Sequence, residues 1–281
     1  MKNIRIRETR SIGDRFPATF EYFFAELKGF FVPFLIYAAP LLLVVLGYST
    51  YVSTSIMETV LEEGSAEDWE EMSKLLAESG FSTMDMIMIL ILSIVASVLT
   101  MSIFGSYMRL REELQDSRPG PGEVFRHALP RMLPMALLLI LSGIAFSLGF
   151  MVFLIGGLIV GVLFAAAYPA IFMEDLSAIE SIQRSFHLCK KNFFNTLGFF
   201  FILIITVVFT FFILSFLLQP ISALGMSMME GMPILGVIIL GIAGIINQLI
   251  NGLIYIGQFL HYGHLSEKED NHSFENEINA L

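Results

Sequence analysis

The sequence predicts an all-α polytopic transmembrane helix bundle of about six spans, with amphipathic interfacial helices on the cytoplasmic side. Of its 281 residues, 56% are hydrophobic and 15% are charged, whereas soluble domains are usually about a quarter charged. The hydrophobic residues gather in long runs without charge, and the cations lie between alternate runs. A soluble fold with so little charge could not cover its own core, so we expect lipid to be the solvent.

The first two spans follow from length. A membrane-spanning helix needs roughly 20 apolar residues, because the hydrocarbon core is about 30 Å thick and a helix rises about 1.5 Å per residue. Residues 29–57 are uncharged and hold a span over about 30–52. This run exceeds the apolar segment of a signal peptide, about 7–15 residues, so we expect it to remain as a span. Residues 86–108 form the second span.

The third and fourth spans share one long apolar run. Residues 132–173 contain no charge over 42 residues, about twice the length of one span. Gly149 and Gly156 lie near the middle of this run. They predict a tight hairpin between spans at about 133–152 and 156–173.

The fourth span also has a packing signal. Gly157, Gly161 and Ala165 recur at four-residue intervals, which is typical of a small-residue ridge that lets another helix approach closely. Pro169 is expected to bend or end this helix near its inner end, because proline lacks the backbone N–H donor.

The fifth and sixth spans complete the bundle, at about residues 195–218 and 233–261. Pro233 opens the last one, where proline suits the first turn of a helix. No arginine or lysine interrupts any of the runs, and one at mid-span would cost about 2.5–3.5 kcal/mol.

The cations determine the orientation. They precede the first span, separate the second from the third and the fourth from the fifth; of the 16 lysines and arginines, Lys74 alone falls on the other side. Positive charge stays in the cytoplasm, so we expect both termini on the cytoplasmic side. Residues 1–265 form the predicted single transmembrane domain, and residues 266–281 a polar, frayed cytoplasmic tail.

Residues 53–85 form the predicted outer loop, which is strongly acidic. Ser65 and Asp68 have the spacing of a helix cap, so we expect a short outer helix anchored near the interface by Trp69. The acidity either keeps the loop soluble or recruits cations or a basic partner.

Amphipathic stretches precede the odd-numbered spans, at about residues 12–28, 122–131 and 177–191. We expect these helices to lie in the interface, with apolar faces in lipid and basic residues near anionic headgroups. They either shield the cytoplasmic end of the bundle or dock a soluble partner. In the third stretch Ser177 and Glu180 form a capping box, and the interfacial residues are Ser177, Glu180, Arg184, Phe186, Lys190 and Lys191.

The first and third stretches share a plan that suggests a threefold unit of interfacial helix plus two-span hairpin. In each, large apolar side chains recur at helical spacing. The predicted stripes are Phe16, Phe20, Phe23 and Leu27 in the first stretch, and Ile179, Ile182, Phe186 and Cys189 in the third.

The run from Glu174 to Phe186, followed by Lys191-Asn192-Phe193, resembles the signature of a large group of uncharacterised bacterial six-span membrane proteins. The N-terminal run 12–16 is similar to Bacteroidetes-type members. The group includes the membrane domain fused to some glycerophosphodiester phosphodiesterases. The resemblance implies a membrane fold, located in a bacterial cytoplasmic (inner) membrane, and no common chemistry. Asp175 stands where glycine is usual, and without a soluble phosphodiesterase domain that activity is not implied.

The sixth span places uncharged polar residues close to one helical face, namely Asn247, Asn251, Tyr255 and Gln258. No ionisable residue lies deep within a predicted span, which argues against a proton-coupled transporter or a voltage sensor. The polar face either hydrogen-bonds neighbouring helices, at about 0.6 kcal/mol per contact, or lines a cavity for a substrate or lipid headgroup.

The sequence contains no catalytic, cofactor-binding or metal-binding signature; HExxH, P-loop and GxSxG motifs are absent. We expect a non-enzymatic scaffold or envelope-maintenance protein, with the lipid bilayer as partner and no nucleic acid. The alternative is a permease or transporter subunit for a small molecule or lipid, in which residues 177–191 dock a cytoplasmic partner protein or ATPase. A third hypothesis is an intramembrane enzyme that acts on lipid through His187 and His261.

Overall fold

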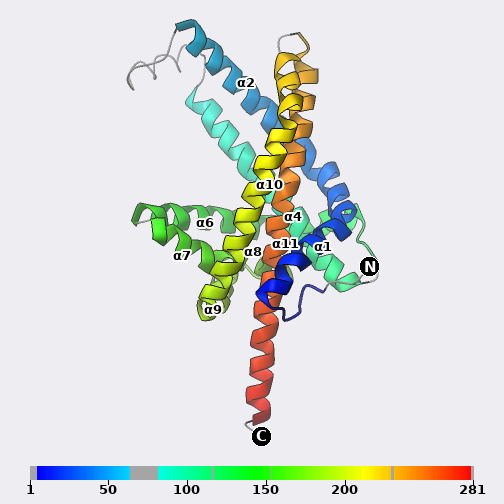
Figure 1. Cartoon of the computed structure of the whole chain (residues 1–281), viewed down its shortest axis with the longest axis vertical. Helices are drawn as coiled ribbons and strands as arrows, with labels where there is room; N and C mark the ends of the chain where they lie inside the picture. The colour runs from blue at the N-terminus through cyan, green and yellow to red at the C-terminus, as the bar shows by residue number, and fades with distance from the viewer. Residues whose placement is uncertain (1–4, 64–81, 116, 153, 229–230, 280–281) are drawn as a thin grey trace. The chain divides into compact units, whose positions relative to one another are not determined.

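The computed structural model describes residues 5–63, 82–115, 117–152, 154–228 and 231–279 (Figure 1). These ranges are predominantly helical and contain no β-strand. The predicted outer helix around Ser65 and Trp69 lies outside them. The elements are α1 (Ile12–Pro33), a π-helical turn (Phe34–Ala38), α2 (Ala39–Glu63), α4 (Thr83–Leu114), α5 (Pro121–Ala128), a 3-10 turn (Leu129–Arg131), α6 (Met132–Val152), α7 (Leu154–Phe164), α8 (Ala167–Met173), α9 (Ala178–Lys191), α10 (Phe193–Met228) and α11 (Pro233–Asn279).

Six helical segments in the described part are long and apolar enough to cross a membrane, so the predicted all-α six-span fold is confirmed. Their outer surfaces are apolar: on α10, Phe209, Phe212 and Phe216 are 67%, 68% and 74% exposed. A soluble protein rarely exposes so large an apolar patch, so lipid must surround these helices. The segments are Ile12–Ser53, Thr83–Leu114, Pro121–Met151, Gly156–Met173, Phe193–Met228 and Leu235–Asp270.

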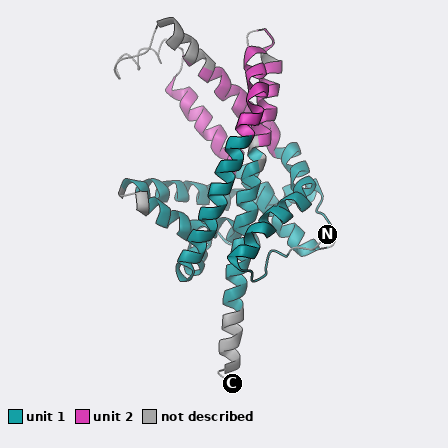
Figure 2. Cartoon of the chain, in the orientation of Figure 1, with its two compact units in different colours: residues 1–37, 98–213, 248–281 teal, residues 38–97, 214–247 magenta. Residues whose placement is uncertain are grey.

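The chain packs as two compact units (Figure 2). Unit 1 comprises residues 1–37, 98–213 and 248–281, and unit 2 comprises residues 38–97 and 214–247. Helices α4, α10 and α11 each contribute to both units. The predicted single transmembrane domain therefore contains two packed regions that share helices.

Several helices run further than predicted. The interfacial helix expected at 12–28 and the span expected at 30–52 follow one another without interruption, because α1 continues through the π-helical turn into α2. Residues 53–63 of the predicted outer loop are helical as well. At the other end, α11 extends past the predicted span end to Asn279, so the frayed tail is also corrected. Leu265 and Ser266 are buried, which holds this extension against unit 1.

The predicted hairpin between the third and fourth spans is confirmed. Helix α6 ends at Val152, α7 begins at Leu154, and the two pack against each other. The two backbones lie close together at two glycines, since a β-carbon on Gly156 would lie 2.5 Å from the carbonyl oxygen of Gly149. Any side chain there would push the hairpin apart.

The fourth span is interrupted, as Pro169 predicts. Helix α7 ends at Phe164 and α8 begins at Ala167, which puts Pro169 in the first turn of α8. The break exposes backbone polar groups, and α9 satisfies two of them. The Ser185 hydroxyl donates to the Leu163 carbonyl at 2.6 Å and accepts the Ala166 N–H at 3.0 Å. This exchange fixes α9 to the break.

Unit 2 is packed through small residues. β-Carbons on Gly241 and Gly244 of α11 would lie 2.0 and 2.5 Å from the side chains of Leu43 and Leu46 of α2. The two helices can therefore approach closely because these α11 positions are glycine.

Candidate functional site

The N-terminus of α9 is capped as predicted. Ser177 is the N-cap residue, and its hydroxyl accepts the Glu180 N–H at 3.4 Å. The Glu180 carboxylate in turn accepts the Ser177 N–H at 2.9 Å. The hydrogen bond from the Ser177 hydroxyl lowers the pKa of Glu180, which keeps a negative charge at the positive end of the helix.

The predicted apolar stripe of α9 is divided, because Cys189 is buried in the protein while Ile179 and Phe186 are exposed. The buried residues of α9 are mostly small: Ala178, Ser181, Ser185, Leu188 and Cys189. Ile179 and Phe186, expected on one apolar face with Cys189, are 63% and 39% exposed. Small side chains let α9 sit close to α7 and α8, so the large ones point away. Burial raises the pKa of the Cys189 thiol.

Two carboxylates, Glu174 and Glu269, join α9 to the C-terminal part of α11. The Arg184 guanidinium donates to Glu174 at 3.0 and 3.1 Å and to Glu269 at 2.7 Å. Lys191 lies 3.1 Å from Glu269, and the Tyr262 hydroxyl donates to Glu174. Burial lowers the pKa of Arg184, but its hydrogen bonds with Glu174 and the nearby negative charge raise it overall, so the guanidinium stays charged.

A second carboxylate cluster centres on Glu26 of α1, which is 7% exposed. The Tyr107 hydroxyl donates to Glu26 at 2.6 Å. The guanidinium groups of Arg111 and Arg118 each donate to Glu26 at 3.1 Å. A buried carboxylate is tolerated only when cations and donors surround it, and α4 with the residues after it supplies all three partners. Gly29 lies against the Tyr107 hydroxyl, where a β-carbon would be 1.8 Å away.

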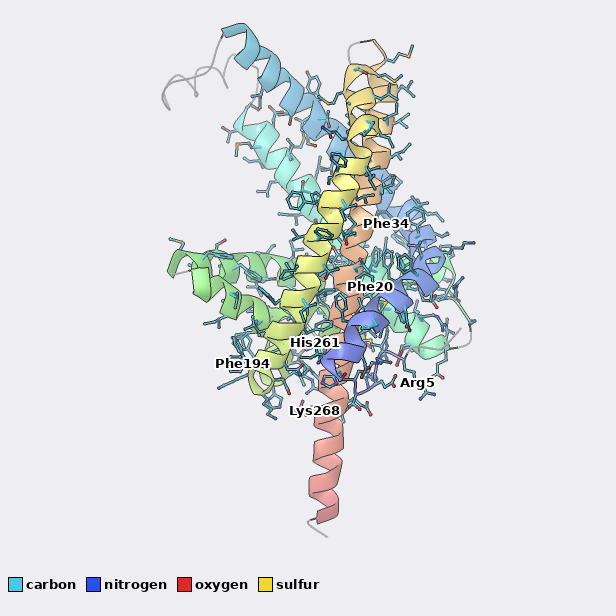
Figure 3. The ribbon with its side chains drawn as sticks, in the orientation of Figure 1. Arg5, Phe20, Phe34, Phe194, His261 and Lys268 are labelled. Carbon is cyan, nitrogen blue, oxygen red and sulfur yellow. The ribbon has the colours of Figure 1, made fainter. Side chains whose placement is uncertain are left out.

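A third polar cluster surrounds Arg15, which is fully buried in unit 1. Its guanidinium donates to Asn195 at 2.6 Å and contacts Nδ1 of His261. Nε2 of His261 lies 3.0 Å from the Thr196 hydroxyl, and the imidazole stacks on Phe199. Figure 3 shows His261 where α1 and α10 meet α11. This cluster therefore ties three helices together.

Neither α1 cluster was predicted from the sequence. The aromatic stripe of this helix was expected in lipid and its basic residues near anionic headgroups, with no buried polar face. A signal was nevertheless present, because Arg15, Thr19, Tyr22 and Glu26 recur at the spacing of one helical face, and that face is buried. In lipid the polar side of such a helix turns inward, since unpaired polar groups in hydrocarbon are costly.

Asp175 occupies the turn between α8 and α9 with a φ of 56°. This left-handed conformation favours glycine. The aspartate is held instead by an ion pair, in which Arg131 Nε donates to its carboxylate at 2.9 Å.

The residues predicted to form one polar face of α11 have different surroundings. The Asn251 amide donates to Gln248 of the same helix at 2.9 Å. Tyr255 packs edge-on against Phe104 and Tyr168. The side chain of Asn247 lies outside the described residues. Gln258 is the member of this face that lines a cleft.

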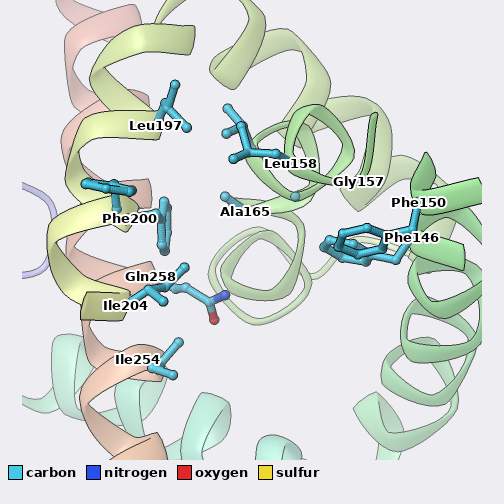
Figure 4. Close-up of a pocket in the computed structure, with 13 residues that line it drawn as sticks. Phe146, Phe150, Gly157, Leu158, Ala165, Leu197, Phe200, Ile204, Ile254 and Gln258 are labelled. Carbon is cyan, nitrogen blue, oxygen red and sulfur yellow. The ribbon is translucent and has the colours of Figure 1, made fainter. Parts of the chain in front are cut away.

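That cleft, of about 440 Å³, lies in unit 1 between the α6–α7 hairpin and helices α10 and α11. Figure 4 shows the Gln258 amide directed into it. The predicted ridge of Gly157, Gly161 and Ala165 forms part of the wall, with Gly157 and Gly161 against the rings of Phe150 and Phe146 of α6. The two glycines of the ridge thus pack against aromatic rings of α6. The remaining lining residues are Leu158, Val162, Leu197, Phe200, Phe201, Ile204 and Ile254.

The arrangement is suited to holding helices and binding apolar molecules. In the part of the chain that the structure describes, no group of three or more His, Cys, Asp or Glu residues is placed to hold a metal ion. Both nitrogens of His261 contact protein groups, Arg15 and Thr196. His187 contacts Glu269. Both histidines therefore serve contacts between helices.

Comparison with family models, curated proteins and solved structures finds no match for this chain.

Proposed function

We propose that this protein is a non-enzymatic scaffold of the bacterial cytoplasmic membrane with a role in envelope maintenance. The observation that supports this function is the polar end of unit 1, the three clusters around Arg15, Glu26 and Arg184. Buried ionisable groups in a membrane protein suggest transport or chemistry by default. Here they are paired with one another across α1, α4, α9, α10 and α11, and the result is a rigid platform.

The orientation is part of the proposal. Arg111, Arg118 and Arg184 belong to the segments that the positive-inside rule assigns to the cytoplasm, together with both termini. The polar end of unit 1 then faces the cytoplasm. The acidic segment between α2 and α4 faces outward.

Helix α9 is the proposed interfacial and docking element of this platform. Ile179 and Phe186 are exposed and would enter the acyl chain boundary, as the apolar face of an interfacial helix does. Lys190 is also exposed and would meet anionic headgroups or a soluble partner. The capped start of α9 and the resemblance of the 174–186 run support a relationship with the group of six-span bacterial proteins described above.

The test is complementation of a deletion strain, scored as resistance to detergent and osmotic shock. Wild type and Lys190→Arg should restore resistance. Lys190→Glu should fold normally, because the side chain is exposed, yet restore resistance poorly. Full restoration of resistance by Lys190→Glu would refute the proposed docking role of α9.

A permease or transporter subunit is the second candidate, and the cleft with Gln258 is the observation that favours it. Proteoliposomes distinguish the two functions. A scaffold should release trapped small cations, anions and neutral solutes no faster than protein-free vesicles. Saturable release that is lost in Gln258→Leu would establish the permease and refute the scaffold.

A further inference from the structure

The cleft of unit 1 reaches the lipid-facing surface. Leu158 and Phe201 line it and are 47% and 61% exposed. Its volume of about 440 Å³ falls within the range of about 300–1,000 Å³ typical of ligand pockets, which are mostly apolar with a few placed polar groups. Among the lining residues, Gln258 is the polar one.

Gln258 has an unused hydrogen-bonding group in this apolar setting. Its Oε1 is buried and has no partner among the described residues. Leaving a buried acceptor unpaired is costly, and native proteins rarely do so without a reason. Asn251, on the same helical face, is paired with Gln248. The Oε1 atom of Gln258 requires a donor, so the missing partner carries an O–H or N–H.

The position of Gln258 indicates which part of a ligand it meets. It lies about one helical turn before His261, which belongs to the polar end of unit 1. The lining residues of α10 run from Leu197 to Ile204, a length of about 10 Å. That is roughly a third of the hydrocarbon core. The cleft is therefore long enough for the part of one acyl chain that lies nearest the headgroup. Gln258 would there meet a hydrogen-bond donor close to that headgroup.

We propose that this cleft is a lipid-binding site, which holds one acyl chain of a membrane lipid while a hydroxyl or amide N–H of that lipid donates to Gln258. The bilayer supplies such molecules directly to the exposed mouth of the cleft. The aromatic and aliphatic walls bind the chain, and Gln258 selects lipids that carry a donor at this depth. The site does not depend on the scaffold function.

The experiment uses the full chain in phosphatidylcholine nanodiscs and a monoacylglycerol with a photoreactive diazirine in its chain. The matched probe is the di-O-methyl ether of the same molecule, which keeps the chain and the acceptor oxygens but has no donor. The variants are Gln258→Leu, Ile204→Trp, which fills the cleft from its wall, and Ile205→Trp as control. Ile205 is exposed on α10 and does not line the cleft.

The expected result is saturable labelling of wild type and Ile205→Trp by the monoacylglycerol, with crosslinks on cleft residues. Gln258→Leu should weaken this binding about tenfold, the loss expected for one buried hydrogen bond, and Ile204→Trp should abolish it. Melting temperatures verify that each variant is folded. Equal, non-saturable labelling by both probes in all variants would overturn the proposal and leave only annular lipid. Wild-type binding that is equally tight for both probes would also overturn it.

Discussion

Replacing Gly29 by alanine should disrupt the Glu26 cluster, because Gly29 lies about one helical turn after Glu26 on the same face of α1. The added β-carbon would lie 1.8 Å from the Tyr107 hydroxyl oxygen and 2.6 Å from Cζ of its ring. Tyr107 is fully buried, so its rigid ring has little room to move. The hydroxyl must therefore leave Glu26, to which it now donates at 2.6 Å.

The expected loss of unfolding free energy in Gly29→Ala combines three effects. Overpacking a buried site costs about 1–3 kcal/mol. Loss of a hydrogen bond to a charged group costs about 1.5–3 kcal/mol. Alanine regains about 0.5–1 kcal/mol over glycine within a helix. The net loss of unfolding free energy should be about 2–5 kcal/mol.

The assay is equilibrium unfolding in mixed micelles, followed by circular dichroism. Gly198→Ala in α10 is the matched control, because its β-carbon would meet no atom within 4 Å, and it should be neutral or slightly stabilising. Tyr107→Phe in the Gly29→Ala background removes the nearest clashing atom, so the double variant should lose less than the two single losses combined. A neutral Gly29→Ala, or strict additivity, would refute this account of the cluster.

Three further outcomes follow from the contacts of α9 and α11. Gln258→Leu should raise the unfolding free energy by about 1 kcal/mol in detergent without donor lipids, because it removes an unpaired buried oxygen; a lower value would mean that this oxygen is already paired. Ser177→Ala should cost about 1 kcal/mol through loss of the N-cap, whereas the exposed Gln183→Ala should change stability by less than about 0.5 kcal/mol. Cys189 should react with maleimide far more slowly than a cysteine introduced in Lys190→Cys, since burial raises the pKa of the Cys189 thiol and shields it. Equal rates would show that α9 detaches from the helices against which it packs.

The features predicted from sequence are those set by neighbouring residues. Uncharged runs locate the spans because a helix must satisfy its own backbone in lipid. The hairpin glycines and the Ser177–Glu180 cap act within a few residues, so their spacing is sufficient to identify them. The break before Pro169 is equally local.

The features missed depend on contacts between distant segments. Glu26 meets Tyr107 and Arg118, and Arg15 meets His261, across intervals that no local pattern joins. The basic residues of α1 were expected near headgroups, whereas Arg15 and Glu26 are buried in unit 1, because in lipid the polar face turns inward. The unpaired amide oxygen of Gln258 could likewise not be predicted. The sequence pattern does not distinguish Gln258 from the three other polar residues of this face of α11, although their surroundings differ.

The most direct test of the cytoplasmic platform is single-cysteine labelling of intact cells with an impermeant maleimide, in a Cys189→Ala background. Thr83, Gly122 and Lys190 are exposed positions for the cysteines. Thr83→Cys should label in intact cells, whereas Gly122→Cys and Lys190→Cys should label only after permeabilisation. Labelling of Gly122→Cys and Lys190→Cys in intact cells, with Thr83→Cys protected, would invert the topology and contradict the proposed platform.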